Sequence, residues 1–170
     1  MNPQEQTEYL KDAIKLAGQN AAFGVSIAEG LIKDATTLLN ILLAGVGGGI
    51  GLCLQLLNSS HPMGLALVVA ICSLYLAAIA VVVVKQCLMS ADLYPPTNSP
   101  ENLLVAAKEP YKNEPTEQIY QWVLESMAAP CQKNTQRNHT RAYWLDRCRI
   151  AAALTPVVFI VGLAVFWASR

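Results

Sequence analysis

The chain has 170 residues, of which 54% are hydrophobic and only 14% are charged, and its twelve basic and twelve acidic residues give a net charge of zero. This composition is too apolar for an ordinary small soluble domain and indicates a membrane protein. The balanced charge gives no overall positive field that would attract nucleic acid, so no nucleic-acid partner is expected.

The first predicted element is one long helix that ends near Leu57. Apolar and small residues recur in it at alternating steps of four and three, which predicts a helical seam for packing. The seam consists of Leu10, Ile14, Ala17, Ala21, Gly24, Ala28, Leu31, Ala35, Leu38, Leu42, Gly45, Gly49, Leu52 and Leu56. The position opposite the seam is polar and holds Asp12, Gln19, Ser26, Lys33 and Asn40.

The two halves of this helix are predicted to lie in different surroundings, water for the first and lipid for the second. The helix carries charges up to Asp34 and none from Ala35 to Leu57. A bilayer core needs about 20 apolar residues, so residues 35–57 are predicted to cross a membrane and residues 1–34 to extend into the cytosol.

The small residues of the helix predict close contact with another helix. In the charged half these are Ala17, Ala21, Gly24 and Ala28, and in the apolar half they are Gly45, Gly47, Gly48, Gly49 and Gly51. Gly45 and Gly49 form one small-xxx-small pair and Gly47 and Gly51 form another on an adjacent face, as in packed membrane helices. The spacing suits contacts within one chain and contacts between chains.

Two further apolar runs, 63–84 and 150–169, are predicted to span the membrane. Only the five residues 58–62 separate the first two spans, so these form an antiparallel hairpin with a tight turn. None of the three spans contains an ionisable residue, which counts against transporters, proton-driven motors and voltage sensors.

Residues 85–149, between the second and third spans, are predicted to form a helical cytosolic segment. A short helix is expected from Ser99 to Pro110, and Pro115 opens a second helix. The apolar face of the second helix consists of Ile119, Trp122, Val123 and Met127. Pro130 is expected to kink or end this helix, after which 131–149 is helical and continues into the third span.

The third span, within the terminal segment 150–170, contains Pro156. This proline is expected to kink the helix, with Thr155 and neighbouring helices satisfying the backbone group that it frees. No strand pattern is present, so the predicted fold is an all-α integral membrane protein with three transmembrane helices.

The basic residues predict the orientation. Eleven of the twelve Lys and Arg residues precede the first span or lie between the second and third, and only Arg170 follows the third. The positive-inside rule therefore places the N-terminus in the cytoplasm and the C-terminus outside. Cys131 and Cys148 then face a reducing compartment and are expected to be thiols.

No catalytic, cofactor or metal site is expected. The two histidines, His61 and His139, fall on opposite sides of the membrane, and Cys131, His139 and Cys148 fit no zinc-site spacing. No nucleophile has a base and an orienting group beside it.

Basic and aromatic residues do alternate near the third span, and the candidates for a binding site there are Arg137, Arg141, Arg147 and Arg149. They suit an anionic ligand such as a nucleotide, but lipid head groups are the favoured partner.

The order of parts is a cytosolic helix that enters a two-span hairpin, followed by a helical segment containing Glu117–Leu124. This order resembles the SLATT and Pycsar-type transmembrane effectors of bacterial antiphage defence over about residues 5–150, and the third span departs from their simplest pattern. The resemblance implies an oligomer that permeabilises the bacterial inner membrane when a cytosolic protein or nucleotide signal arrives, often a cyclic nucleotide.

The first functional hypothesis is therefore a non-enzymatic, homo-oligomeric membrane effector. The alternative is a structural, immunity or assembly subunit of a membrane complex, such as a secretion-system or phage accessory protein, without a pore of its own. A holin is a third option, which the large, charge-balanced segment between the second and third spans disfavours.

Overall fold

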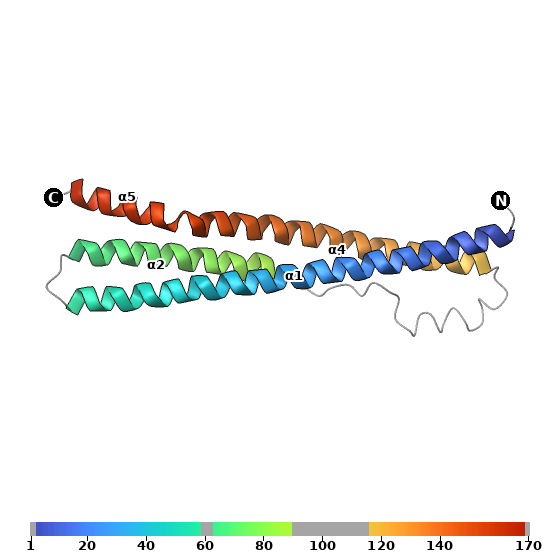
Figure 1. Cartoon of the computed structure of the whole chain (residues 1–170), viewed down its shortest axis with the longest axis horizontal. Helices are drawn as coiled ribbons and strands as arrows, with labels where there is room; N and C mark the ends of the chain where they lie inside the picture. The colour runs from blue at the N-terminus through green and yellow to red at the C-terminus, as the bar shows by residue number, and fades with distance from the viewer. Residues whose placement is uncertain (1–2, 59–62, 90–115, 169–170) are drawn as a thin grey trace. The chain divides into compact units, whose positions relative to one another are not determined.

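The computed structural model describes residues 3–58, 63–89 and 116–168, and within these ranges it contains helices and no strand (Figure 1). The elements are α1 (Pro3–Asn58), α2 (Met63–Val83), the π-helical turn η1 (Val84–Leu88), α4 (Thr116–Ala153) and α5 (Thr155–Ala168). The helix predicted from Ser99 to Pro110 and the turn predicted after Asn58 lie outside the described residues.

Three helical stretches are long and apolar enough to cross a membrane: Glu5–Asn58, Met63–Leu88 and Gln118–Ala168. Within the described residues, the prediction of an all-helical chain with three helices able to span a membrane is therefore confirmed. The helix α1 is also continuous through Asp34, where its charges end.

The chain divides into two units. Residues 1–29 and 91–140 form one, here called the charged unit, and residues 30–90 and 141–170 form the other, the apolar unit. Both α1 and α4 contribute residues to each unit.

The burial of α1 follows the seven-residue period of its sequence. Its buried residues are Ala21, Ala28, Ala35 and Leu42, each on the seam and each seven residues after the last. The residues opposite the seam, Asp12, Gln19, Ser26, Lys33 and Asn40, are all exposed. From Ala21 to Leu42 the seam is therefore the face of α1 that packs against protein, as a heptad spacing dictates. Beyond Leu42 the prediction is wrong for Leu52, which is 45% exposed, whereas its neighbour Cys53 is half-buried.

In the apolar unit, α2 lies antiparallel beside the C-terminal half of α1 and also beside α5 (Figure 1). Successive α1–α2 contacts pair Gly45 with Leu76, Gly49 with Ser73 and Cys53 with Ala66. The descending numbers on α2 show the antiparallel direction of the predicted hairpin. The buried core of this unit draws on α1, α2, η1 and α4 and consists of Ala35, Leu42, Ile79, Ala80, Val83, Cys87, Leu145 and Cys148.

A single turn residue, Leu154, separates α4 from α5. Pro156 has no backbone N–H, so the carbonyl of Ala152 loses its helical donor. The Thr155 hydroxyl donates to that carbonyl oxygen at 2.7 Å, and the Tyr75 hydroxyl of α2 donates to the carbonyl oxygen of Ala151 at 2.9 Å. The predicted rescue of the freed carbonyl by Thr155 is therefore confirmed, whereas the neighbouring helix α2 satisfies the carbonyl one residue earlier instead.

Of the two effects expected of Pro130, a kink or the end of its helix, the second is wrong. The helix α4 runs from Thr116 to Ala153 with Pro130 inside it. Met127 and Asn134, about one turn to either side of the proline, are both buried. Packing on both sides therefore holds the helix together although proline removes one of its hydrogen bonds.

In the charged unit, α4 contacts α1 through a buried amide. Asn138 is buried, and its Nδ2 donates to the carbonyl oxygen of Gly24 at 2.8 Å. Of the apolar face predicted for this helix, Met127 is buried, whereas Trp122 is 47% exposed. The packed face of α4 in this unit is thus centred on Met127, Asn134 and Asn138 rather than on Trp122.

Candidate membrane assembly surface

Two of the glycines in the apolar half of α1 make room for α2. A Cβ atom built on Gly45 would lie 2.9 Å from Leu76 Cδ1, and one built on Gly49 would overlap the Ser73 hydroxyl. No side chain larger than hydrogen fits at Gly49 without moving α2 or Ser73. Gly45 and Gly49, here called the closed face, therefore serve contact within the chain.

The remaining glycines of this half face away from the other described residues. Gly47, Gly48 and Gly51 are exposed, and a Cβ atom at any of them would meet nothing within 4 Å. Ala44 and Asn40 are also exposed and lie on the same side of the helix, about one and two turns before Gly48. These five residues form the open face, which has no large side chain.

A small-residue face has a specific consequence in lipid. Membrane helices gain no hydrophobic free energy by associating, so they associate where small residues let two backbones approach closely. The Asn40 side chain adds an exposed polar group. An amide in a bilayer is stabilised by a hydrogen bond to another helix. The open face therefore combines close approach with a polar anchor.

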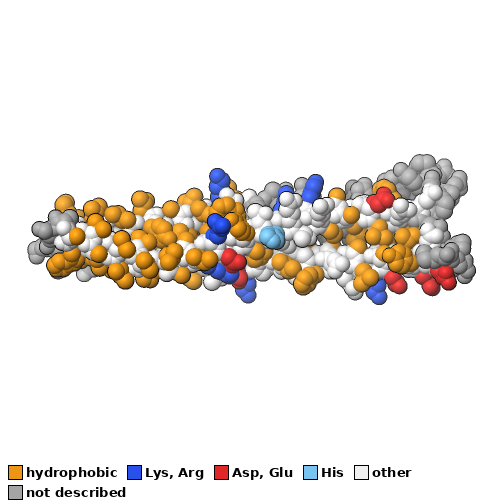
Figure 2. Space-filling view, turned by 90° about the horizontal axis from the view of Figure 1, so that it is seen from above, with side chains coloured by type: hydrophobic (Ala, Val, Ile, Leu, Met, Phe, Trp, Pro, Cys, Tyr) orange, Lys and Arg blue, Asp and Glu red, His pale blue; other side chains and the backbone are white. Residues whose placement is uncertain are grey.

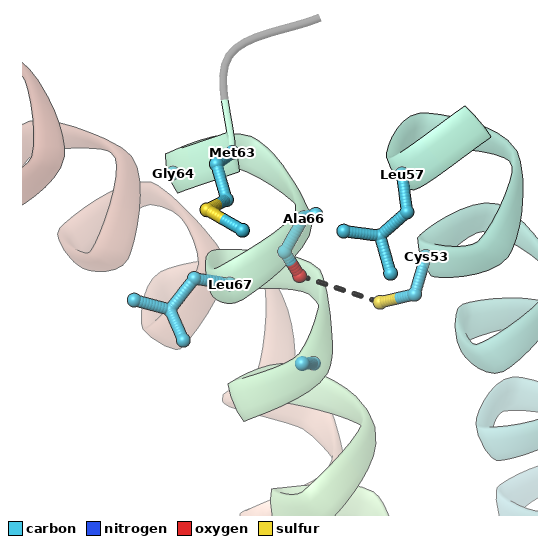
Figure 3. A pocket seen from close by; sticks show the side chains of 7 residues that line it. Cys53, Leu57, Met63, Gly64, Ala66 and Leu67 are labelled. Carbon is cyan, nitrogen blue, oxygen red and sulfur yellow. Dashed lines mark hydrogen bonds between the residues drawn. The ribbon is translucent and has the colours of Figure 1, made fainter. Parts of the chain in front are cut away.

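Two shallow apolar grooves run between α1 and α2. The first has a volume of about 510 Å³ and is lined by Cys53, Leu57, Met63, Gly64, Ala66, Leu67 and Ala70 (Figure 3). The second, of about 310 Å³, shares Cys53 and Ala70 with the first. Figure 3 shows Cys53, whose thiol donates to the carbonyl oxygen of Ala66 at 3.3 Å. Such grooves suit acyl chains rather than catalysis, because they lack charged groups.

An ion pair lies at the polar boundary of the apolar unit. Arg149 Nη2 lies 2.7 Å from Asp34 Oδ2, and Arg149 Nη1 lies 3.5 Å from Asp146 Oδ1. Asp34 is the last charged residue of α1, and Arg149 is the last one before α5. Figure 2 shows hydrophobic side chains covering the rest of this unit on the face in view, with charged side chains gathered at one end of it.

The four arginines suggested as an anion or head-group site have different surroundings. Arg141 is only 4% exposed, whereas Arg147 and Arg149 are exposed. The Arg147 guanidinium stacks 4.4 Å from the centre of the Tyr143 ring, and Arg149 is engaged by the two aspartates. These three arginines of the apolar unit therefore do not converge on one anion. Arg137 belongs to the charged unit and is half-buried.

Of the small seam residues of the charged unit, Ala21 and Ala28 are buried against protein, and Ala17 and Gly24 are half-buried. A Cβ atom built on Gly24 would meet nothing within 4 Å, so this glycine is not required by a close side-chain contact. The partner amide Asn138 was missed by the sequence reasoning, because hydrophobic periodicity does not register polar residues. The seven-residue spacing of Cys131, Asn138 and Leu145 would have indicated this face of α4 if polar residues had been counted together with apolar ones.

Across residues 3–58, 63–89 and 116–168, no group of three or more His, Cys, Asp or Glu side chains is placed to hold a metal ion. All five cysteines are free, as was expected for Cys131 and Cys148.

No family model matches the chain, and neither a curated protein nor a solved structure is significantly similar to it. The open face therefore has to be interpreted from its own geometry.

Proposed function

We propose that the chain is a non-enzymatic membrane protein whose copies assemble through the open face of α1 and permeabilise a bacterial inner membrane in response to a cytosolic signal. The observation that carries this proposal is the division of the glycines. Ser73 of the same chain fills the space beside Gly49, whereas a Cβ atom on Gly48, the next residue of the predicted span, would meet nothing within 4 Å.

The remaining features agree with this role. The spans carry no ionisable side chain, so the proposed action is on the bilayer itself rather than on a transported ion. With the N-terminus in the cytoplasm, the charged unit lies where a protein or nucleotide signal arrives. That signal acts only if it binds one packing of the helices more tightly than another. This is the behaviour implied by the resemblance to SLATT and Pycsar-type effectors.

A second candidate function uses the same face. In a structural, immunity or assembly subunit, the open face would receive a helix of another membrane protein and no pore would form. The largely apolar grooves beside α2 favour this candidate, because they have no charged residue in their lining that could support a polar path across the membrane.

The test compares the full-length chain with Gly48→Leu and Gly48→Ala, each induced in bacterial cells. Leucine prevents close helix approach, whereas alanine keeps the face small. We expect Gly48→Leu to abolish dye entry and to reduce the oligomer detected by chemical crosslinking, and Gly48→Ala to retain both. Unchanged dye entry and oligomer size in Gly48→Leu would overturn the proposal. Loss of the oligomer from a chain that never admits dye would favour the assembly subunit.

A further inference from the structure

The charged unit carries a second apolar stripe on α1, away from the packed seam. Tyr9, Leu16, Phe23 and Ile27 are 66%, 60%, 66% and 40% exposed. Large apolar side chains on a helix surface surrounded by water mark an interaction surface when they form a contiguous row. The buried Ala21 and Ala28 belong to the seam, so the stripe is a distinct face of the same helix.

The stripe has the spacing of a coiled coil. Tyr9, Leu16 and Phe23 are seven residues apart, and Ala13, Asn20 and Ile27 form a parallel series that begins four residues after Tyr9. Two such series are the a and d positions of a heptad, with Asn20 and Ile27 at a and Leu16 and Phe23 at d. Each of these four side chains is exposed within the described part of the chain. The second stripe is therefore a complete pairing face over about three heptads.

The polar residue within the stripe indicates what occupies it. An asparagine at a single a position pairs with the same asparagine of an identical strand and thereby fixes two parallel strands in register. Asn20 is such a residue, because its amide both donates and accepts a hydrogen bond. The β-branched Ile27 at a and Leu16 at d also favour two strands. The chemistry of this face is therefore complementary to itself.

Insertion into one membrane would orient the α1 helices of two copies in parallel, as this pairing requires. Every copy of the chain inserts the same way, because the same basic residues decide its topology. Two copies therefore present Asn20 at the same height and with parallel helices. We infer that residues 9–27 of α1 form a parallel, in-register coiled coil with the same residues of a second copy. This inference rests on the proposed function in one respect, namely that copies assemble in one membrane.

The test uses disulfide crosslinking of the full-length chain in native membranes, with the five native cysteines replaced by serine. Leu16→Cys and Phe23→Cys lie on the stripe, and Lys15→Cys and Ala22→Cys are matched controls, exposed and one residue earlier on another side of α1. Under mild oxidation we expect about tenfold more dimer from each stripe variant than from its control. Equal yields at both kinds of position, monomer alone, or a crosslink to a different protein would overturn the inference.

Two variants test the chemistry by amine-reactive crosslinking of the native-cysteine chain that also carries Gly48→Leu, in which the open face no longer contributes to assembly. Phe23→Glu places a charge on the stripe and is expected to reduce the dimer about tenfold, whereas Ala22→Glu leaves it unchanged. Asn20→Leu removes the residue that sets strand number, so the dimer is expected to be joined by larger oligomers. A dimer that survives Phe23→Glu, or that alone persists in Asn20→Leu, contradicts the coiled coil.

The failure of this inference can be told apart from the failure of the proposed function. If Phe23→Cys gives no dimer while Gly48→Leu still abolishes dye entry, the coiled coil is wrong and the membrane role stands. If Phe23→Cys gives the dimer while Gly48→Leu leaves dye entry unchanged, the coiled coil stands and the role of the open face is wrong.

Discussion

Arg149 donates a hydrogen bond of 2.7 Å to the Asp34 carboxylate, which joins the last charge of α1 to the last charge before α5. Both side chains are about half exposed, so we expect a coupling energy of only about 0.2–1 kcal/mol. The measurement is a double-mutant cycle of Asp34→Ala and Arg149→Ala on the unfolding free energy of the detergent-solubilised protein. The coupling should shrink as salt is raised, and a large, salt-independent value would contradict a solvated pair.

Neighbouring glycines provide a matched comparison of the closed and open faces. Gly49→Ala places a methyl group on the Ser73 hydroxyl, and we expect a loss of about 1–3 kcal/mol in unfolding free energy. Gly48→Ala places the same group in open space, and we expect a change within about 0.5 kcal/mol. Denaturant unfolding of the dispersed, monomeric chain in detergent measures both. A similar loss at the two positions would mean that α2 does not pack on Gly49.

The contact between α2 and α5 depends on Gly64, where a Cβ atom would overlap the Phe166 ring. We expect Gly64→Ala to lower the thermal unfolding midpoint, and to lower it less in a Phe166→Ala background, because the obstructing ring is then absent. Gly51→Ala, with nothing within 4 Å, is the control. Strict additivity of Gly64→Ala and Phe166→Ala would show that the two residues are not in contact.

The break at Leu154 leads to a prediction about backbone satisfaction. Tyr75→Phe and Thr155→Val each remove a hydroxyl donor from a carbonyl near Pro156, and each is expected to cost about 0.5–1.5 kcal/mol. Pro156→Ala restores a backbone N–H for the carbonyl of Ala152, so Thr155→Val should cost less in that background. Unfolding free energies of the single and double variants measure this effect. An unchanged cost in the Pro156→Ala background would contradict the proposed role of the Thr155 hydroxyl.

The packed face of α1 could be predicted from sequence because its signal is purely periodic. A seven-residue recurrence of small and apolar residues marks one side of a helix whatever packs there, so the burial of Ala21, Ala28, Ala35 and Leu42 required no knowledge of the partner. The hairpin was predictable for a similar reason, since five residues between two spans leave only an antiparallel arrangement.

The packed face of α4 could not be predicted in the same way. Its buried positions include Asn134, Asn138 and Arg141, which are polar and therefore count against a seam in any hydrophobic pattern. Pro130 also led to the prediction of two shorter helices in place of the single helix α4. Polar burial of this kind depends on partners supplied by tertiary structure, such as the Gly24 carbonyl oxygen for Asn138.

The roles of the glycines required the register between α1 and α2. Gly45 and Gly49 have the same spacing as Gly47 and Gly51, and composition cannot distinguish the pairs. The positions of Leu76 and Ser73 decide which pair is covered. The basic cluster likewise became interpretable only once Tyr143 was seen to engage Arg147 and Asp34 to engage Arg149.

The adjacent positions 48 and 49 are subject to different selection, because only the second is occupied by the chain's own atoms. Selection for folding alone keeps residue 49 a glycine in any descendant of this chain. Selection restricts residue 48 to a small side chain only if the open face contacts another molecule and this contact is required for function. Restriction of residue 48 to small side chains among descendants of this chain would therefore indicate that its copies contact one another.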